Sequence, residues 1–99
     1  MGNPNDVWLC IFRTERQSRT EIDTSLVFDP KNNRFQIRVS QDYETQAKIE
    51  FSYSDADAYF ATHQNDREKA RKAINDHMAT NPEYEKVLRS ALARMKNLG

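Results

Sequence analysis

The side chains of this chain that could catalyse a reaction or bind a metal are few and far apart. His63 and His77 are the only histidines, and Cys10 is the only cysteine. A zinc site needs three or four such ligands at close spacing. The acids nearest the histidines, Asp66 and Asp76, do not complete a ligand set of this kind. We therefore expect no metal site, and we expect the histidines to be partly exposed residues of helices.

The acidic and hydroxyl side chains do not form a catalytic pattern either. Asp55 and Asp57 lie two positions apart, so on a helix they diverge and cannot share a proton. First-turn acids that interact with the positive end of a helix dipole explain them better. No serine or cysteine stands in an order with histidine and an acid that singles out a nucleophile. We expect the chain not to be an enzyme.

Glycine is absent from every position between Gly2 and Gly99. Backbones that wrap a phosphate or turn sharply at a nucleophile need glycine, because only a residue without Cβ adopts positive φ freely. A phosphate-binding loop, a dinucleotide fingerprint, a nucleophile elbow and an EF-hand are therefore excluded. We expect no cofactor.

Length and composition indicate one soluble domain that spans residues 1–99. Hydrophobic residues make up 37% and charged residues 30% of the chain, so its core must be small. Lysine and arginine number 15 and so do aspartate and glutamate, and neither sign forms a long block. This balance argues against strong sequence-independent binding of nucleic acid and equally against an acidic mimic of nucleic acid.

The single cysteine lies in the longest apolar run, Val7–Phe12. One cysteine cannot form an internal disulfide, so the chain suits a reducing compartment, and we expect Cys10 to be a small buried hydrophobic residue. The run is far too short to cross a bilayer, and no signal peptide is evident. The predicted location is cytoplasmic, with no membrane contact.

Hydrophobic periodicity changes from two to about 3.6 near Ser54, which predicts strands before this residue and helices after it. Val7–Phe12 is apolar at both parities, as is typical of a central strand covered on both faces or of a strand that meets a partner. The other segments alternate apolar and polar residues. The predicted fold is α+β, a four-stranded antiparallel meander followed by two or three helices packed on one face. Its strands are Val7–Phe12, Ile22–Phe28, Phe35–Val39 and Ala47–Tyr53.

The register of the second and third strands follows from the turn between them. Pro30 favours a type I turn, and Asn32 or Asn33 can adopt the left-handed conformation that glycine would normally take. Pairing Phe28 with Phe35 buries one apolar face, whereas a slip of one residue would bury arginines. The same register pairs Leu26 with Ile37 and Thr24 with Val39.

The third and fourth strands can be aligned in the same way. Placing Val39 opposite Ile49 also places Ile37 opposite Phe51 and, on the other face, Arg38 opposite Glu50. Apolar pairs and an opposite-charge pair both favour this register.

Three capping patterns mark the helical half of the chain. Ser54 and Asp57 predict a first helix with an apolar edge at Ala56, Tyr59 and Phe60. Asn65 or Asp66 is the predicted cap of a following segment, and the pattern leaves open whether residues 55–79 form one bent helix or two. Asn81-Pro82-Glu83 predicts a further helix start. Its apolar stripe comprises Tyr84, Val87, Leu88, Ala91, Leu92, Met95 and Leu98.

Two sets of cations could bind a nucleic acid. Four of the six residues from Arg67 to Lys72 are basic, although acids are interleaved and a solvated helix face explains them as well. If Trp8 and Phe12 lie beside the cations of the sheet, stacking rings and charges would suit a single strand. The alternative is that the two rings fill the core and Arg38 pairs with Glu50. The cations concerned are Arg34, Arg38, Lys48, Arg67, Lys69, Arg71 and Lys72.

The predicted order, four antiparallel strands followed by helix, resembles the plan of Pur-type and Whirly single-strand-binding domains. Two copies of those domains commonly associate through helices and sheets, so the resemblance implies a nucleic-acid-binding sheet and a homodimer. It concerns topology alone.

The leading hypothesis is a small non-catalytic protein-interaction module, such as a bacterial or phage accessory or inhibitor protein that acts by occupying a partner protein. Trp8, Phe12 and Met95 are the predicted anchors, because interface energy concentrates in large apolar and aromatic side chains. Binding of single-stranded DNA or RNA is the alternative. Either hypothesis is compatible with a homodimer that pairs through Val7–Phe12 or through apolar helix surface.

Overall fold

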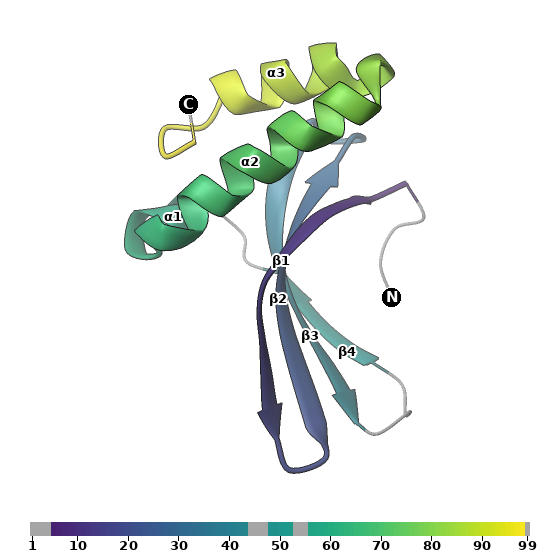
Figure 1. Cartoon of the computed structure of the whole chain (residues 1–99), viewed down its shortest axis with the longest axis vertical. Helices are drawn as coiled ribbons and strands as arrows, with labels where there is room; N and C mark the ends of the chain where they lie inside the picture. The colour runs from purple at the N-terminus through teal and green to yellow at the C-terminus, as the bar shows by residue number, and fades with distance from the viewer. Residues whose placement is uncertain (1–4, 44–47, 53–55, 99) are drawn as a thin grey trace.

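The computed structural model describes residues 5–43, 48–52 and 56–98, and the side chains of Tyr43 and of the segment 48–52 lie outside this description. It confirms an α+β protein that combines an antiparallel sheet of three long strands with three α-helices (Figure 1). The strands are β1 (Val7–Gln17), β2 (Thr20–Asp29), β3 (Arg34–Tyr43) and the short β4 (Lys48–Ser52), in the order β1-β2-β3-β4. The helices are α1 (Ala56–Thr62), α2 (Gln64–Thr80), the 3₁₀ turn η1 (Pro82–Tyr84) and α3 (Glu85–Ala93).

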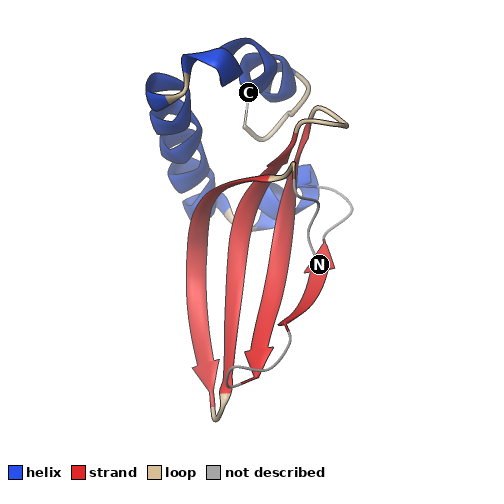
Figure 2. Cartoon of the chain, turned by 90° about the vertical axis from the view of Figure 1, so that its right-hand side faces the viewer, coloured by secondary structure: helices blue, strands red, loops and turns tan. Residues whose placement is uncertain are grey.

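The first strand differs from its prediction in position and in length. Val7–Phe12 was expected to be either a central strand or a strand that meets a partner. In the structure β1 is not central but lies at the edge of the sheet, and it continues to Gln17. Its second half is exposed and polar, so no hydrophobic period marks it in the sequence. Figures 1 and 2 show that the helices gather at one end of the sheet and that the β1–β2 hairpin projects away from them. No described helix covers the hairpin, so its side chains face solvent and can be polar.

The predicted register between β2 and β3 is confirmed. Phe28 lies opposite Phe35, Leu26 opposite Ile37, and Thr24 opposite Val39. The rings of the first pair have centroids 5.4 Å apart. Asn33 has φ of 51°, so it takes the left-handed position that the sequence assigned to an asparagine.

The predicted register between β3 and β4 is wrong by two residues. Val39 lies opposite Phe51 rather than Ile49, and Arg38 lies opposite Ser52 rather than Glu50. Side chains alternate with a period of two, so a slip of two residues keeps every side chain on its predicted face. The polarity pattern therefore cannot detect the shift. The described part of the fourth strand is the five residues of β4, and the ends of the predicted segment, Ala47 and Tyr53, lie outside the description.

The core forms between the helices and one face of the sheet, which we call the helix face. Leu26, Phe28, Ile37 and the helix residue Phe60 are fully buried. Burial of each such side chain contributes roughly 1.5–3 kcal/mol. The buried apolar cluster comprises Phe12, Leu26, Phe28, Phe35, Ile37, Ala56, Tyr59, Phe60, Ala70, Ile74, Met78, Leu88, Ala91 and Leu98.

The structure divides residues 55–79 into two helices and corrects the predicted start of the second. Helix α2 begins at Gln64, and Asp66, expected as its cap, is instead buried in the first turn. The Asp66 carboxylate accepts hydrogen bonds from the Arg13 guanidinium and from the Tyr59 hydroxyl, the latter at 2.5 Å. This cluster ties β1 to the corner between α1 and α2. The predicted cap Ser54 lies outside the described residues.

The last helix is shorter than its apolar stripe suggested. Helix α3 ends at Ala93, yet Leu98 is buried. The chain folds back beyond α3 because the Asp57 carboxylate accepts the backbone N–H groups of Lys96 and Asn97, at 3.2 and 2.9 Å. Asp57, predicted to act only on the helix dipole, therefore also holds the C-terminal turn against α1.

Asp29 organises the turn between β2 and β3. Its carboxylate accepts the N–H groups of Lys31 and Asn32 and, at 2.7 Å, the side-chain amide of Asn32. The hydrogen bond from the Asn32 side chain is the largest cause that holds the pKa of Asp29 below its ordinary value. The ionised carboxylate is thus favoured by folding.

We expect the Asp29→Ala variant to lose about 1–2 kcal/mol of unfolding free energy at neutral pH, because several hydrogen bonds disappear. A carboxylate whose pKa is lowered by folding stabilises the protein above its unfolded-state pKa, and this contribution is lost as the pH falls through the folded-state pKa. Urea unfolding at pH 7 and near pH 3 should therefore show a difference between wild type and variant that shrinks in acid. A difference that is constant or larger in acid would contradict this role.

Candidate protein-interaction surface

The face of the sheet opposite the helix face contains the candidate site, and we call it the Trp8 face. Register assigns its members, because Trp8 lies opposite Val27, and Val27 lies opposite Gln36. Ile11 and Arg38 lie opposite Ser25 from either side, which places both on this face as well.

Two irregularities in the pairing of β1 decide which of its side chains reach this face. They lie between Trp8 and Cys10 and between Ile11 and Arg13. Each inserts an extra residue, so the alternation of faces is interrupted. Trp8 is therefore on the Trp8 face, whereas Cys10 lies opposite Leu26 on the helix face.

Trp8 and Ile11 form the exposed apolar part of the site, which we call the Trp8–Ile11 patch. Trp8 is 47% exposed and Ile11 is 59% exposed, and they are the large hydrophobic residues left exposed in the part of the chain that the structure describes. Beside them is a hollow of about 330 Å³. The hollow is lined by Trp8, Leu9, Cys10, Ile11, Asp23, Ser25 and Ser40.

Part of the lining of this hollow is polar, namely Asp23, Ser25 and Ser40. Ser25 and Ser40 are buried, and the Asp23 carboxylate accepts a hydrogen bond from the Thr14 hydroxyl at 2.7 Å. An apolar rim with a few polar groups beneath it is the usual make-up of a binding site, because the rim supplies affinity and the polar groups orient the ligand.

A buried arginine supports the indole ring of Trp8. The Arg38 guanidinium carbon lies 5.6 Å from the Trp8 ring centroid, within the range of a cation–π contact. The same guanidinium pairs with the Asp6 carboxylate and donates to the Gln36 side-chain oxygen at 2.9 Å. Nε and Nη1 of Arg38 have no hydrogen-bond partner among the described residues. The indole ring therefore lies beside a buried guanidinium that Asp6 and Gln36 hold in place.

The other predicted anchors lie elsewhere. Phe12 is 5% exposed and belongs to the core, with its ring centroid 5.9 Å from that of Tyr59 and 5.8 Å from that of Phe60. The irregularity between Ile11 and Arg13 falls at Phe12, and the ring packs in the core rather than at the surface. Met95 is half-buried against the core and lines a separate hollow beside Ala91 and Arg94.

The cations of the nucleic-acid alternative are not gathered on one surface. Arg38 is buried and pairs with the Asp6 carboxylate. The side chain of Glu50, its expected partner, lies outside the description. Arg34 is exposed on the Trp8 face, 4.0 Å from the Asp29 carboxylate. Lys48 is in β4, and its side chain lies outside the description.

The remaining cations are on α2, which packs on the helix face and is therefore separated from Arg34 and Arg38 by the sheet. Arg71 pairs with Glu68 at 3.4 Å, and Lys72 pairs with Asp76 at 2.8 Å. Lys69 donates to the backbone carbonyl of Phe12 at 3.4 Å. Arg67 is half-buried on the same helix.

The two histidines and the cysteine, which the sequence offered as reactive side chains, pack against neighbouring residues of the fold. His63 stacks on Tyr59 with ring centroids 4.1 Å apart, and the ring of His77 lies 5.3 Å from that of Tyr84. Burial raises the pKa of the Cys10 thiol, opposed in part by a hydrogen bond with the backbone of Leu26. Asp55 lies outside the described residues. Within those residues, histidine, cysteine and acidic side chains form no group of three suited to a metal ion.

Comparison with protein-family models, with curated proteins and with solved structures finds no match to this chain. What the chain does is therefore inferred from its own geometry. No helix in the described segments combines the length and the apolar character that crossing a bilayer requires.

Proposed function

We propose that the chain is a non-catalytic binding module that occupies a partner protein through the Trp8–Ile11 patch. The observation that supports this function most directly is the exposure of two large hydrophobic side chains beside one hollow, on the rigid face of a sheet. A half-exposed tryptophan supported by a buried arginine is the type of side chain in which binding energy concentrates. An accessory or inhibitor protein of a bacterium or phage is the class of small protein that works in this way.

Replacement of Trp8 tests the proposal. We expect Trp8→Ala to weaken binding of the purified partner about 30-fold or more, which corresponds to roughly 2 kcal/mol for a central anchor. The partner is identified by affinity capture with the wild-type chain, and the dissociation constants are then measured by isothermal titration calorimetry.

Leu92→Ala is the matched control, because Leu92 is a half-buried large apolar residue of α3 that packs against the core and lines neither hollow beside β1. It should leave the dissociation constant unchanged. Circular dichroism and urea unfolding must show that both variants are folded. A folded Trp8→Ala variant that binds as tightly as wild type would refute the assignment of this patch.

A homodimer is a second way to cover the same patch. Light scattering gives the mass of the purified chain and of Trp8→Ala. A wild-type dimer that the Trp8 variant converts to monomer would identify a second copy as the partner.

Single-strand binding stays a prediction, and the geometry does not favour it. Its cations are divided between the two faces of the sheet, and its most central member, Arg38, is buried. Phosphate contacts produce binding that weakens steeply with salt. We expect no measurable binding of a labelled oligonucleotide at low salt, whereas tight and salt-sensitive binding would support this alternative over the first.

A further inference from the structure

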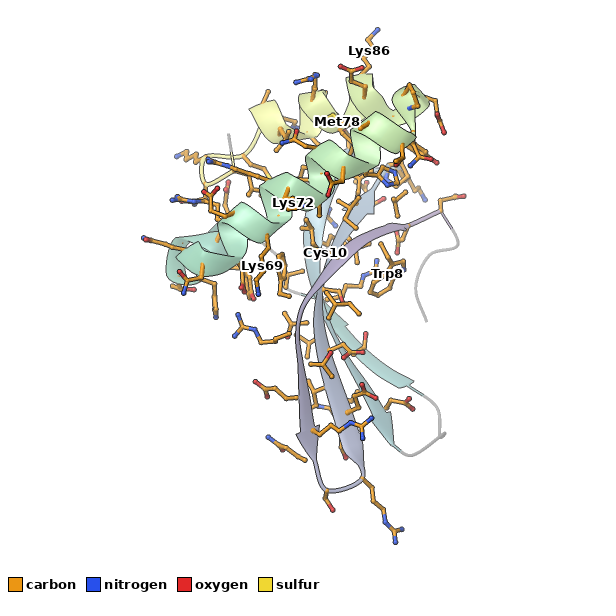
Figure 3. The ribbon with its side chains drawn as sticks, viewed as in Figure 1. Trp8, Cys10, Lys69, Lys72, Met78 and Lys86 are labelled. Atoms are coloured by element: carbon orange, nitrogen blue, oxygen red, sulfur yellow. The ribbon has the colours of Figure 1, made fainter. Side chains whose placement is uncertain are left out.

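A second groove borders β1 on the side of the helices. It has a volume of about 480 Å³ and lies between the edge of β1 and helix α2. Figure 3 shows Lys69 and Lys72 on α2 close to the stretch of β1 that contains Cys10, and Figure 2 shows α2 behind the sheet at its β1 edge. The groove is lined by Leu9, Cys10, Ile11, Lys69, Lys72, Ala73, Asp76, His77 and Thr80.

The same three residues of β1 border the hollows on both faces of the sheet. Leu9, Cys10 and Ile11 line the hollow beside Trp8 as well as the groove beside α2. No described strand pairs with β1 on its outer side. An edge strand offers backbone N–H and C=O groups to an extended segment, and successive side chains of that segment point to opposite faces. A segment added here would place one side chain in each hollow.

Features at both ends limit the stretch of β1 that can pair. The irregularities at Trp8/Cys10 and at Ile11/Arg13 place an extra residue at Leu9 and at Phe12, so the regular stretch between them is Cys10–Ile11. Beyond it, Lys69 contacts the carbonyl oxygen of Phe12. A bulge disrupts the regular ladder, so the added segment must be short.

The charge of the groove indicates what the segment carries. Lys72 is already paired with Asp76, but Lys69 has no carboxylate partner among the described residues and contacts a backbone oxygen. Lys69 can therefore form an ion pair with an incoming acid without giving up an existing one.

We propose that β1 binds a short extended acidic segment of the partner protein as an additional strand beside Cys10 and Ile11. An apolar side chain of the segment enters the hollow beside Trp8, and the adjacent side chain, an aspartate or glutamate, reaches Lys69. Backbone pairing supplies affinity and the two hollows supply specificity, as in other strand-addition complexes. This inference rests on the proposed function and specifies the chemistry of its partner.

A random dodecapeptide library displayed on phage and selected on the whole chain tests the proposal. We expect enriched peptides to carry an acid next to a large apolar residue. Synthetic copies should bind Lys69→Glu at least tenfold more weakly than wild type, and replacing the peptide's acid by lysine should restore binding to that variant. Lys86→Glu is the matched control, since Lys86 is an exposed lysine on α3, far from β1 in Figure 3, and it should bind like wild type.

Methylation of the peptide backbone distinguishes strand addition from a simple ionic contact. N-methyl groups at one set of alternate residues remove the N–H groups that face β1, and the other set points away. We expect one set to abolish binding and the other to be tolerated. Equal binding by both sets, an unaffected Lys69→Glu variant, or failure to select any acidic peptide would each overturn the proposal.

The outcomes also separate this inference from the proposed function. If the natural partner binds Trp8→Ala poorly but binds Lys69→Glu normally, the interaction module stands and the strand-addition mode is wrong. If neither variant weakens the natural partner, both are wrong. A stable dimer of the wild-type chain that Lys69→Glu does not alter and that protects Cys10 and Ile11 from hydrogen exchange would assign the edge to a second copy and overturn the acidic segment.

Discussion

Phe12→Ala is expected to lower the free energy of unfolding by about 3–5 kcal/mol, the usual cost of removing a buried phenylalanine side chain. Phe12 is 5% exposed, and its ring packs against those of Tyr59 and Phe60 in the cluster that joins β1 to α1. Small domains are stable by only about 5–15 kcal/mol, so this loss would bring the chain close to unfolding. Urea denaturation followed by circular dichroism measures it.

The neighbouring residue is a sharp control for this prediction. Ile11 directly precedes Phe12 in the same strand but is 59% exposed. Ile11→Ala should therefore change the unfolding free energy by no more than about 0.5 kcal/mol. If Phe12→Ala fails to fold, Phe12→Leu should still fold with a smaller loss, because most of the ring volume is refilled. Equal stabilities of the Phe12 and Ile11 alanine variants would contradict the placement of Phe12 in the core.

Asp6→Ala is also expected to lower the free energy of unfolding by about 3–5 kcal/mol. The reason is that it leaves the buried Arg38 guanidinium without its carboxylate partner. The side chains of Asp6 and Arg38 are 1% and 9% exposed, so water cannot replace the lost partner easily. Two nitrogens of the guanidinium already have no hydrogen-bond partner among the described residues, which makes Arg38 especially dependent on Asp6. Urea unfolding again gives the loss.

A double-mutant cycle separates the ion pair from its surroundings. Replacing both residues by apolar ones, as in Asp6→Leu with Arg38→Met, removes both charges, so this double variant should recover much of the stability that either single change loses. Losses that simply add would show that Asp6 and Arg38 are not coupled. Because Arg38 also supports the ring of Trp8, the double variant should still bind the partner more weakly than wild type.

Phe12 and Trp8 lie on opposite sides of the same short stretch of β1. Phe12 stabilises the fold and Trp8 is free to contact a partner, although plain alternation along Val7–Phe12 would put both rings on one face. Binding and stability can therefore be changed separately, with Trp8→Ala affecting mainly the first and Phe12→Ala mainly the second.

The amino-acid sequence by itself determined the class of the fold and the pairing of β2 with β3. A change of hydrophobic period near Ser54 divides strands from helices, and a one-residue slip would have buried Arg34 and Arg38 on the wrong face. The turn between Asp29 and Asn33 could likewise be predicted from the sequence, because few residue types other than asparagine replace glycine at positive φ. The tertiary structure alone decided which strand is at the edge, which face Phe12 occupies, how β4 aligns with β3 and which acid pairs with Arg38.

The physical reason is that alternation reports the face of a side chain relative to its neighbours along one strand and nothing else. A bulge adds one residue and exchanges the faces, as at Leu9, while a slip of two residues leaves the faces unchanged, as between β3 and β4. Neither event alters the polarity pattern that a sequence displays. The candidate site depends on both the bulges and the edge position of β1, and its tryptophan lies beside the Arg38–Asp6 pair, so only the tertiary structure defines it.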